Sequence, residues 1–538
     1  MFLYKQYTEG GNPLKRTSFI QRTFKNTTKG ITNNIEINNT FDRNKIHFST
    51  DINKNEHTLQ EQLGTSQDVM NLSLKIPLKD NKTINAILVA IDGLVNEEII
   101  HNFVIKPLTD SLLDNNSIKN FTSIRSKLIV KDTEIEENFE KAINQVLKAK
   151  ALLIVDGIPK GLLISVEGFE TRSIGEPETE QKVRGAREGF SESININLSL
   201  IRRRIAHPSL RFEALDIGEF SQTTITIAYI KDIADPQLLK RVKKRLNQIK
   251  VDSINNSGEI EQLIEDHPYS IFPTVGNTEL PDKMAALLME GRVCILINGD
   301  PVCLFAPFLF IEGTKHIEDY NSRPYYASFI RLIRFFSFIL CITLPALYIT
   351  AINFNKSLIP SDLILPLIME KDSVPFPLAL EIIMMLLMFE LVREAGVRLP
   401  KQVGTAVSII GPLILGEVAV TSSISSPSTL IIVSISYITS FVITSIADVS
   451  ALLRIILFVA ASLFGAYGFI VVLLATITHM VSLTSLGVPY MAPLSPFYLQ
   501  DWKDTLIRFP TRSLKYRPKS IPNLRPMKMS SIPEEDKS

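Results

Sequence analysis

The sequence contains little cysteine and almost no excess charge of either sign. Its three cysteines, Cys294, Cys303 and Cys341, form no CxxC pair, which argues against a disulfide framework and favours a reducing compartment. The 57 Lys and Arg residues nearly balance the 56 Asp and Glu residues, so composition gives no general attraction to nucleic acid. The first residues, MFLYKQYTEGGNPLKR, are polar and charged, so we expect no signal peptide.

Familiar catalytic and phosphate-binding motifs are also lacking. The seven histidines show no HExxH or HxxxH spacing, and GxSxG does not occur. The charged stretch EPETEQKVRGAREGFSESININLSLIRRRI, residues 176–205, contains neither GxxxxGK[ST] nor GxGxxG, although it follows a strand-like run. We therefore expect no enzymatic activity, no catalytic residue, no cofactor and no metal site.

What the sequence does have is a long apolar region. Most charged residues lie before residue 335 or after residue 500. A membrane-spanning helix needs about 20 mostly apolar residues. The candidate spans are residues 332–353, 376–392, 403–421, 427–447 and 452–486. The pattern predicts an integral membrane protein with a large N-terminal soluble part.

The predicted chain has four parts. Residues 1–65 form a disordered Asn/Thr-rich tail, residues 66–325 a cytoplasmic domain, residues 326–490 a transmembrane domain, and residues 491–538 a basic tail. The predicted fold class is an α+β or α/β N-terminal region followed by an all-α polytopic transmembrane domain of about 4–6 segments. Two related subdomains, with a boundary near residues 205–220, are indicated by a repeated hairpin pattern. The matched residues are Val155, Gly157, Pro159 and Leu162 in the first hairpin, and Ile297, Gly299, Pro301 and Leu304 in the second.

Local patterns give several elements of the soluble region. TINAILVAIDG (83–93) is predicted to be a buried strand, and the residues after it a helix. Thr133 and Glu136 match a capping box for a helix with Ile135 and Phe139 on its apolar face. TTITIAYI (223–230) alternates like a strand, and Asp235-Pro236 is typical of a helix start.

Basic residues flank the apolar region at both ends. Arg323, Arg331 and Arg334 precede the first span, and the C-terminal tail is basic, so both ends are expected in the cytoplasm. Two cytoplasmic ends need an even number of crossings, whereas the apolar blocks are odd in number. Either the third block, with Gly404, Gly411-Pro412 and Gly416, is broken or re-entrant, or the long last block contains an additional crossing.

Helical spacing accounts for much of the charged stretch at 176–205. Glu178 and Lys182 are four residues apart, as are Glu180 and Arg184. Gly185 and Gly189 would share one helical stripe with Ser193, which suits close packing. Two interpretations stay open, a solvated charged helix and a contact between subdomains or subunits. The candidate interface residues are Arg184, Gly185, Arg187, Glu188, Gly189, Arg202, Arg203 and Arg204.

Acidic residues in the apolar region are candidates for a pore. A carboxylate at the bilayer centre costs about 2.5–3.5 kcal/mol on insertion scales, so it usually faces a cavity, a pore or a partner. The candidates are Glu381, Glu417, Glu390 and Glu394. At 100° per residue, Glu390 and Glu394 share a face and Glu381 points away from Glu390. The alternative is that Glu390 and Glu394 pair with nearby basic residues. Asp448 and Arg454 are predicted to lie in a short loop.

Several long motifs resemble one known family. GEPETEQKVRGAREGFSESININLSLIRRRI, HPSLRFEALDIGEFSQTTITIAYI, PFPLALEIIMMLLMFELVREAGVRLP and VGTAVSIIGPLILGEVAV closely resemble the A subunits of nutrient germinant receptors of endospore-forming bacteria, over residues 70–520.

The resemblance implies a protein of the spore inner membrane that acts with a germinant-binding, transporter-like B subunit and a lipoprotein C subunit. It also implies a homo-oligomer that forms a germinant-gated cation channel in contact with membrane lipids. A stage V sporulation channel relative, which amplifies ion release, is the nearest alternative. A secondary transporter and a signalling scaffold without a pore are further alternatives.

Overall fold

The computed structural model describes residues 46–80, 82–110, 112, 121–168, 175, 177, 180, 184–399, 410–411, 414–443 and 446–529. Most of the predicted N-terminal tail therefore lies outside the described residues. Its last part, however, contains helix α2 (Ile52–Leu63), which begins at an Asp51 cap. Ile52, Leu59 and Leu63 are buried on one side of α2, so this part of the chain has enough apolar surface to fold. The predicted tail boundary at residue 65 is wrong for this reason.

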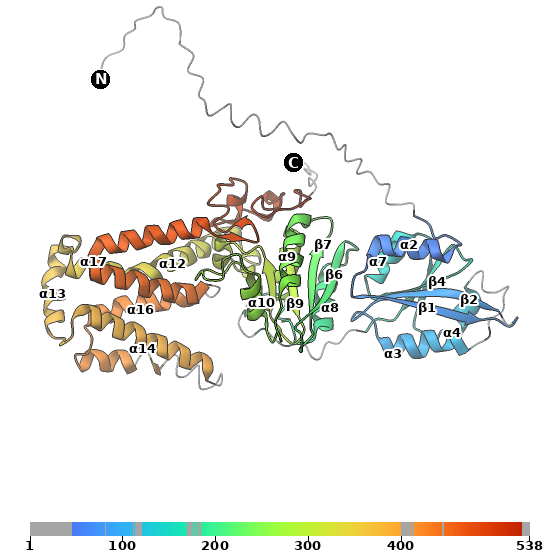
Figure 1. The fold of residues 1–538 in the computed structure, drawn as a ribbon, viewed down its shortest axis with the longest axis horizontal. Coiled ribbons are helices and arrows are strands. Elements are labelled where there is room, and N and C mark those ends of the chain that lie inside the picture. The colour runs from blue at the N-terminus through green and yellow to red at the C-terminus, as the bar shows by residue number, and fades with distance from the viewer. Residues whose placement is uncertain are drawn as a thin grey trace, which may run out of the picture. The chain divides into compact units, whose positions relative to one another are not determined.

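The first antiparallel sheet has the strand order β1-β2-β4-β5-β3. Helices α2 and α7 contact one side of it, and the η1–α4 segment packs on the other (Figure 1). Ile87–Ile91 of β2 are all buried because both faces of the sheet are covered. The elements, besides α2, are β1 (Val69–Pro77), β2 (Thr83–Ile91), α3 (Glu97–Ile99), the π-helix η1 (Ile100–Ile105), α4 (Lys106–Asp110), α6 (Thr122–Lys127), β3 (Thr133–Glu136), α7 (Phe139–Val146), β4 (Lys150–Val155) and β5 (Gly161–Ser165).

The second antiparallel sheet repeats this topology, with the order β6-β7-β9-β10-β8. Its apolar residues pack against α9 and α10 in one cluster and against α8 and α11 in another. The repeated hairpin occupies the same place in both sheets, with Gly157 and Gly299 at positive φ in the β4–β5 and β9–β10 turns. The elements are α8 (Ile194–Arg204), β6 (Leu210–Ile217), β7 (Thr223–Ile230), α9 (Pro236–Gln248), α10 (Ser257–Ile264), β8 (Gly276–Thr278), α11 (Pro281–Glu290), β9 (Val293–Ile297) and β10 (Cys303–Ala306).

Several sequence predictions for this region are confirmed and others are wrong. The strands predicted at 83–93 and 223–230 are β2 and β7, and Asp235 caps α9 with Pro236 in its first turn. The capping box at Thr133 and Glu136 is wrong: these residues are the ends of β3, and Asn138 caps α7. Because α8 packs on the second sheet, that subdomain begins before the predicted boundary near residues 205–220.

The charged stretch is not a continuous helix. Residues 184–193 have no helical assignment, and Gly185 has φ of 122°. Two glycines so close together weaken a helix, and here the Gly189 amide instead donates to the Gly175 carbonyl at 3.0 Å. The helix prediction is therefore wrong for residues 184–193, and Ser193 is the N-cap of α8. The predicted pair of Glu178 and Lys182 lies outside the described residues.

The apolar region folds into helices packed side by side (Figure 1). Helix α12 begins before the predicted start at residue 332, and α13 was not predicted because Pro366 and its charged residues interrupt the apolar pattern. Part of the third block, including Gly404 and Pro412, lies outside the described residues. The elements are α12 (Pro324–Asn353), α13 (Ser361–Asp372), α14 (Leu378–Arg398), α16 (Pro427–Phe441) and α17 (Ala447–Ser482), with short 3-10 helices η2 (Phe310–Thr314), η3 (Ile317–Tyr320) and η4 (Lys356–Leu358).

Helix α17 bends sharply at Gly465, where φ is 59° and ψ is −141°. A Cβ at Gly465 would lie 2.7 Å from the Phe354 ring, at the C-terminal end of α12. Both ends of α17 lie beside the second subdomain, because Ile446 lies against Gly313 and the His479 ring is 3.0 Å from Ser270 Oγ. The two halves of α17 therefore run in opposite directions. Asp448 and Arg454 belong to its first half, so the prediction of a loop there is wrong.

The segment after α17 returns to the second subdomain. A two-stranded turn, β11 (Thr484–Ser485) and β12 (Val488–Pro489), is followed by the 3-10 helices η6 (Asp501–Lys503) and η7 (Thr511–Ser513). Further on, the Leu524 amide donates to the Ile233 carbonyl at 2.8 Å. The C-terminal segment thus joins the end of α17 to the second sheet.

Candidate functional site

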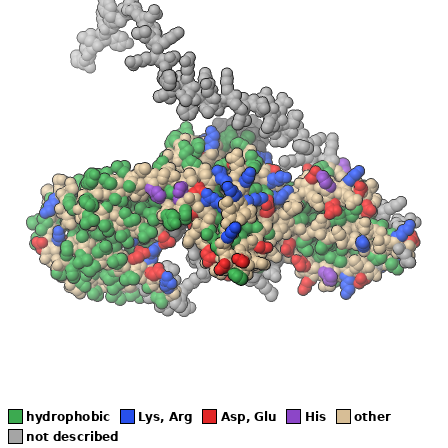
Figure 2. Space-filling view, viewed as in Figure 1, with side chains coloured by type: hydrophobic (Ala, Val, Ile, Leu, Met, Phe, Trp, Pro, Cys, Tyr) green, Lys and Arg blue, Asp and Glu red, His purple; other side chains and the backbone are tan. Residues whose placement is uncertain are grey.

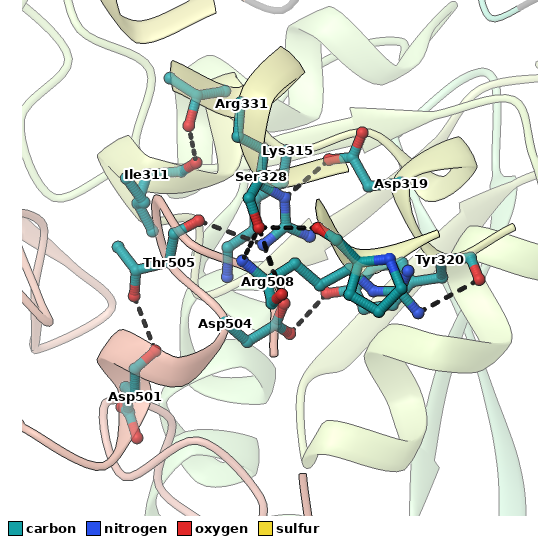
Figure 3. Close-up of polar contacts among 12 residues, drawn as sticks. Ile311, Lys315, Asp319, Tyr320, Ser328, Arg331, Asp501, Asp504, Thr505 and Arg508 are labelled. Atoms are coloured by element: carbon teal, nitrogen blue, oxygen red, sulfur yellow. Dashed lines mark hydrogen bonds and ion pairs between the residues drawn. The ribbon is translucent and has the colours of Figure 1, made fainter. Parts of the chain in front are cut away.

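Three chain segments meet in a polar cluster at the base of α12, which we call the basal junction. They are residues 316–322, the first turns of α12, and residues 501–508 (Figure 3). Arg331 of α12 is fully buried at the centre. Its Nε lies 2.8 Å from Asp319 Oδ2, and its Nη1 lies 2.8 Å from Asp504 Oδ1. One guanidinium therefore links a segment before α12 to a segment beyond α17.

Tyr320 is held between two arginines of the basal junction. The Arg331 and Arg508 guanidinium carbons lie 5.4 and 5.3 Å from its ring centre. The Tyr320 hydroxyl donates to Asp504 Oδ2 at 2.6 Å (Figure 3). The Tyr320 side chain is 41% exposed, but loss of water around its hydroxyl and the Asp504 carboxylate raise its pKa, so the phenol stays a neutral donor. Ser328 Oγ accepts from the Arg508 amide at 2.9 Å and completes the tie to α12.

A second buried arginine lies next to the junction. Arg292 precedes β9, and its Nη2 lies 2.9 Å from Glu312 and 3.3 Å from Glu290. Burial alone raises the pKa of a carboxyl, and it does so for Glu290. For Glu312, Arg292 and Lys315 outweigh burial and lower the pKa to about 2. A cavity of about 50 Å³ borders these groups and Asp504, which is room for a water molecule rather than an organic ligand.

The arginines at the end of α8 differ in their burial and in their partners. Arg202 is buried and forms two bonds with Asp68, at 2.7 and 3.1 Å, just before β1. Arg204 contacts Asp282 and lies 2.8 Å from Glu188. Arg203 is exposed, with Glu188 at 3.7 Å. Arg202 therefore joins the two α/β subdomains.

Of the remaining candidates in the charged stretch, Arg184, Gly185 and Arg187 are exposed and Gly189 is buried. Arg184 exchanges hydrogen bonds with Asn321, at 3.4 and 2.9 Å, and Gly185 and Arg187 are exposed. A Cβ at Gly189 would lie 3.1 Å from the Pro177 nitrogen, so this glycine allows a close backbone approach. Glu180, expected to pair with Arg184, pairs instead with Lys283 at 2.6 Å. The predicted contact with another subunit stays a prediction.

The acids of the apolar region do not form one group. Glu381 is fully buried, and its Oε1 accepts from the Ser426 amide and hydroxyl, both at 2.7 Å, at the start of α16. Glu390 contacts Arg393 and lies 3.4 Å from Arg454 of α17. The Glu394 carboxylate pairs with Arg398 at 2.6 Å. Pairing of Glu390 and Glu394 with basic residues is thus confirmed.

Glu417 differs from these acids because its side chain is exposed. It lies on the helical residues 414–421, beside the exposed Ile414 and Val418. Among the described residues, no basic side chain lies within ion-pair distance of its carboxylate. The Glu417 side chain is thus an exposed acid on an apolar surface.

Sequence reasoning did not find most of the basal junction. Arg331 and Arg334 were interpreted as topology signals, yet both are bound to Asp319, with Arg334 Nη1 2.8 Å from Asp319 Oδ1. Asp504 and Arg508 lie more than a hundred residues from Arg331, so no local spacing connects them. The geometry of the basal junction suits holding these segments together.

Comparisons with known proteins place these features in context. The family model of the Bacillus/Clostridium GerA spore germination protein matches residues 57–520. The chain is 39% identical to spore germination protein KA of Bacillus subtilis, over 88% of each chain. It is 35% identical to spore germination protein GerLA of Bacillus cereus, over 86% of this chain and 94% of the relative. The solved N-terminal domain of the A subunit of the Bacillus megaterium germinant receptor GerK3 is 32% identical, with a TM-score of 0.39, and is covered over 98% of its length and 49% of this chain.

Proposed function

This chain belongs to the GerA spore germination protein family, and we propose that it is the A subunit of a nutrient germinant receptor that oligomerises in the spore inner membrane as a germinant-gated cation channel. Relatives over most of the chain are named spore germination proteins, which supports the receptor role. The α/β region and the C-terminal segment lie on the cytoplasmic side in this proposal. A B subunit binds the germinant and a lipoprotein C subunit completes the receptor.

Membrane insertion is supported by the lengths and surfaces of the helices. Pro324–Asn353 and Ala447–Ser482 are long and apolar enough to cross a membrane. A straight helix of 36 residues would be about 54 Å long, well beyond a hydrocarbon core of about 30 Å. The bend at Gly465 divides α17 into two halves that each suit one crossing. In this proposal, the additional crossing added to the five predicted blocks gives an even number of segments, as two cytoplasmic ends require.

The observation that carries the channel proposal is the exposed carboxylate of Glu417. A carboxylate that faced lipid at the bilayer centre would cost about 2.5–3.5 kcal/mol on insertion scales, and the cost falls towards the interface. In an oligomer, the same face can line a water-filled path, where a ring of carboxylates favours cations. Glu381, Glu390 and Glu394 have partners within the chain, so they fit structural roles better than Glu417 does.

Subunit contacts and coupling complete the proposal. The exposed segment with Arg184, Gly185 and Arg187 is a surface for a neighbouring A subunit. The basal junction connects the second sheet to α12 and to the end of α17, so a movement of the α/β region can reach the helices without a flexible link. Gly189→Leu is expected to impair assembly because its side chain would press on the Pro177 backbone. Normal assembly of this variant would argue against a contact there.

Ion release from spores tests the function. The chain is expressed with its B- and C-type partners in a host that lacks other germinant receptors, and cation release is recorded after nutrient addition. Glu417→Gln is expected to slow release while the receptor still assembles. Glu394→Gln serves as the matched control because that acid already has an Arg398 partner. Equal release from wild type and Glu417→Gln would exclude the acidic path, and no release from the wild type would exclude the channel.

A further inference from the structure

The surface around the basal junction carries an unusual set of exposed apolar side chains. We call it the basal apolar patch and define it by Tyr325 and Phe329 of α12 and by Phe497, Leu499, Ile507 and Phe509 of the C-terminal segment. These side chains are between 43% and 87% exposed. Large apolar side chains this exposed, when they form one patch, mark a binding surface.

Contacts within the chain hold the two parts of the patch together. The Arg508 amide donates to Ser328 Oγ at 2.9 Å, so Ile507 and Phe509 lie beside the turn of α12 that carries Tyr325 and Phe329. Phe497 packs on Trp502, with ring centres 5.4 Å apart, and Trp502 belongs to η6 in the same segment. The patch is therefore a built surface anchored through buried polar bonds.

The charges around the patch are of one sign. Residues 491–529 contain only two acids, Asp501 and Asp504. Asp501 is buried and accepts from the amides of Lys519 and Ser520, at 2.8 and 2.7 Å. Asp504 is bound in the basal junction. The exposed charges near the patch are Arg323, Lys503, Arg512 and Lys515.

The place of the patch along α12 gives its depth. Tyr325 and Phe329 lie ahead of Phe335, where the uninterrupted apolar run of α12 begins after Arg334. At about 1.5 Å per residue they are about 9–15 Å along the helix from the start of that run, on the water-facing side of the hydrocarbon core. Aromatic side chains gather at this depth in membrane proteins, and basic residues beside them meet anionic headgroups.

We infer that the basal apolar patch and its basic rim bind the anionic lipid surface of the membrane, with the C-terminal segment lying in the headgroup layer. The inference rests on the proposed membrane insertion of α12 and α17. A second copy of the chain fits the patch less well, because two basic rims would meet and repel each other. Figure 2 shows hydrophobic side chains over the helical part of the chain, the part that faces lipid in the proposed function.

Trp502 is the one tryptophan of the chain, so its fluorescence reports on contact between this segment and lipid. The full chain is placed in nanodiscs that contain either brominated phosphatidylcholine or brominated phosphatidylglycerol at equal mole fraction. We expect both lipids to quench Trp502 and the anionic one to quench it more. Lys503→Gln, Arg512→Gln and Lys515→Gln are expected to reduce the preference for the anionic lipid by up to about fivefold for each charge removed.

Two controls separate the inference from the proposal on which it rests. Phe220→Ser removes an exposed aromatic side chain from the β6–β7 turn and should leave quenching unchanged. Tyr467→Trp combined with Trp502→Phe moves the reporter to an exposed position in the second half of α17. If that reporter is quenched and Trp502 is not, the inference is wrong and membrane insertion stands. If neither is quenched, insertion itself is wrong.

Two further outcomes would also overturn the inference. Equal quenching by both brominated lipids, unchanged in the charge variants, would exclude a preference for anionic lipid. Protection of Trp502 from both lipid and aqueous iodide would show that protein, such as a second copy or another subunit, covers the patch.

Discussion

Removal of the Arg202 guanidinium is expected to loosen the joint between the two α/β subdomains. Arg202 and Asp68 are 1% and 2% exposed, and their two bonds lie within a network in which Ser66 Oγ donates to Asp68 at 2.6 Å. Breaking such a buried pair from one side costs about 3–5 kcal/mol, because the other charge stays buried without compensation. Arg202→Leu should therefore strongly favour local opening of the joint.

Hydrogen exchange of the full chain measures this opening directly. The Gln67 amide donates to the Phe212 carbonyl at 2.9 Å across the joint, and the Phe212 amide donates to Ser66 Oγ at 3.0 Å. A cost of about 3–5 kcal/mol corresponds to exchange about 10²–10⁴-fold faster at these amides. Protection at β4 and β9, away from the joint, should change much less.

Two variants test the reasoning. Arg203→Leu, at the exposed neighbouring position, should change the opening free energy by no more than about 0.5 kcal/mol. Asp68→Leu in the Arg202→Leu background should restore part of the lost protection, because no unpaired charge remains. The reasoning is refuted if Arg202→Leu and Arg203→Leu give the same exchange at the two amides.

Three further predictions follow from single residues. Arg331→Met should destabilise the detergent-solubilised chain by about 3–5 kcal/mol in thermal unfolding, whereas Met at the exposed Arg323 should have little effect. Burial raises the pKa of Glu261 to about 7. The neutral Glu261 carboxyl therefore stabilises the fold fully below the unfolded pKa of 4.5, and this stabilisation is lost as pH rises through 7. Unfolding of Glu261→Gln should therefore depend less on pH over this range, by up to about 3 kcal/mol, and unchanged pH dependence would contradict this. Gly465→Ala should cost about 1–3 kcal/mol in unfolding experiments, since φ is positive and the new Cβ would press on Phe354; a neutral effect would argue against the bend.

The elements that the sequence predicted well are those defined by local patterns. The strands of both repeated hairpins have uninterrupted apolar runs between glycine turns, and α9 has its Asp-Pro start. The capping-box prediction that was wrong concerns a segment whose local pattern fits both a helix and a strand. Thr133 and Glu136 fit a capping box, but alternate residues of the same short segment also suit an edge strand, and pairing with β5 decides for the strand.

The contacts within the candidate site could not be predicted from the sequence. The arginines near the start of α12 were visible, but their aspartate partners come from Asp319 and Asp504, and only the tertiary fold brings those together. Glu381 was visible as an intramembrane acid, but its hydrogen bonds to Ser426 depend on the return of α16 beside α14. Non-local pairing of this kind has no signal in one sequence.

The cation selectivity of the reconstituted oligomer tests the central claim most directly. Reversal potentials are recorded across a bilayer with a salt gradient, for the wild type and for Glu417→Gln and Glu417→Lys. The account predicts a cation-selective conductance that weakens when the carboxylate is neutralised and turns towards anions with lysine. A conductance whose reversal potential is the same in all three proteins, or no conductance from the assembled wild type, would contradict it.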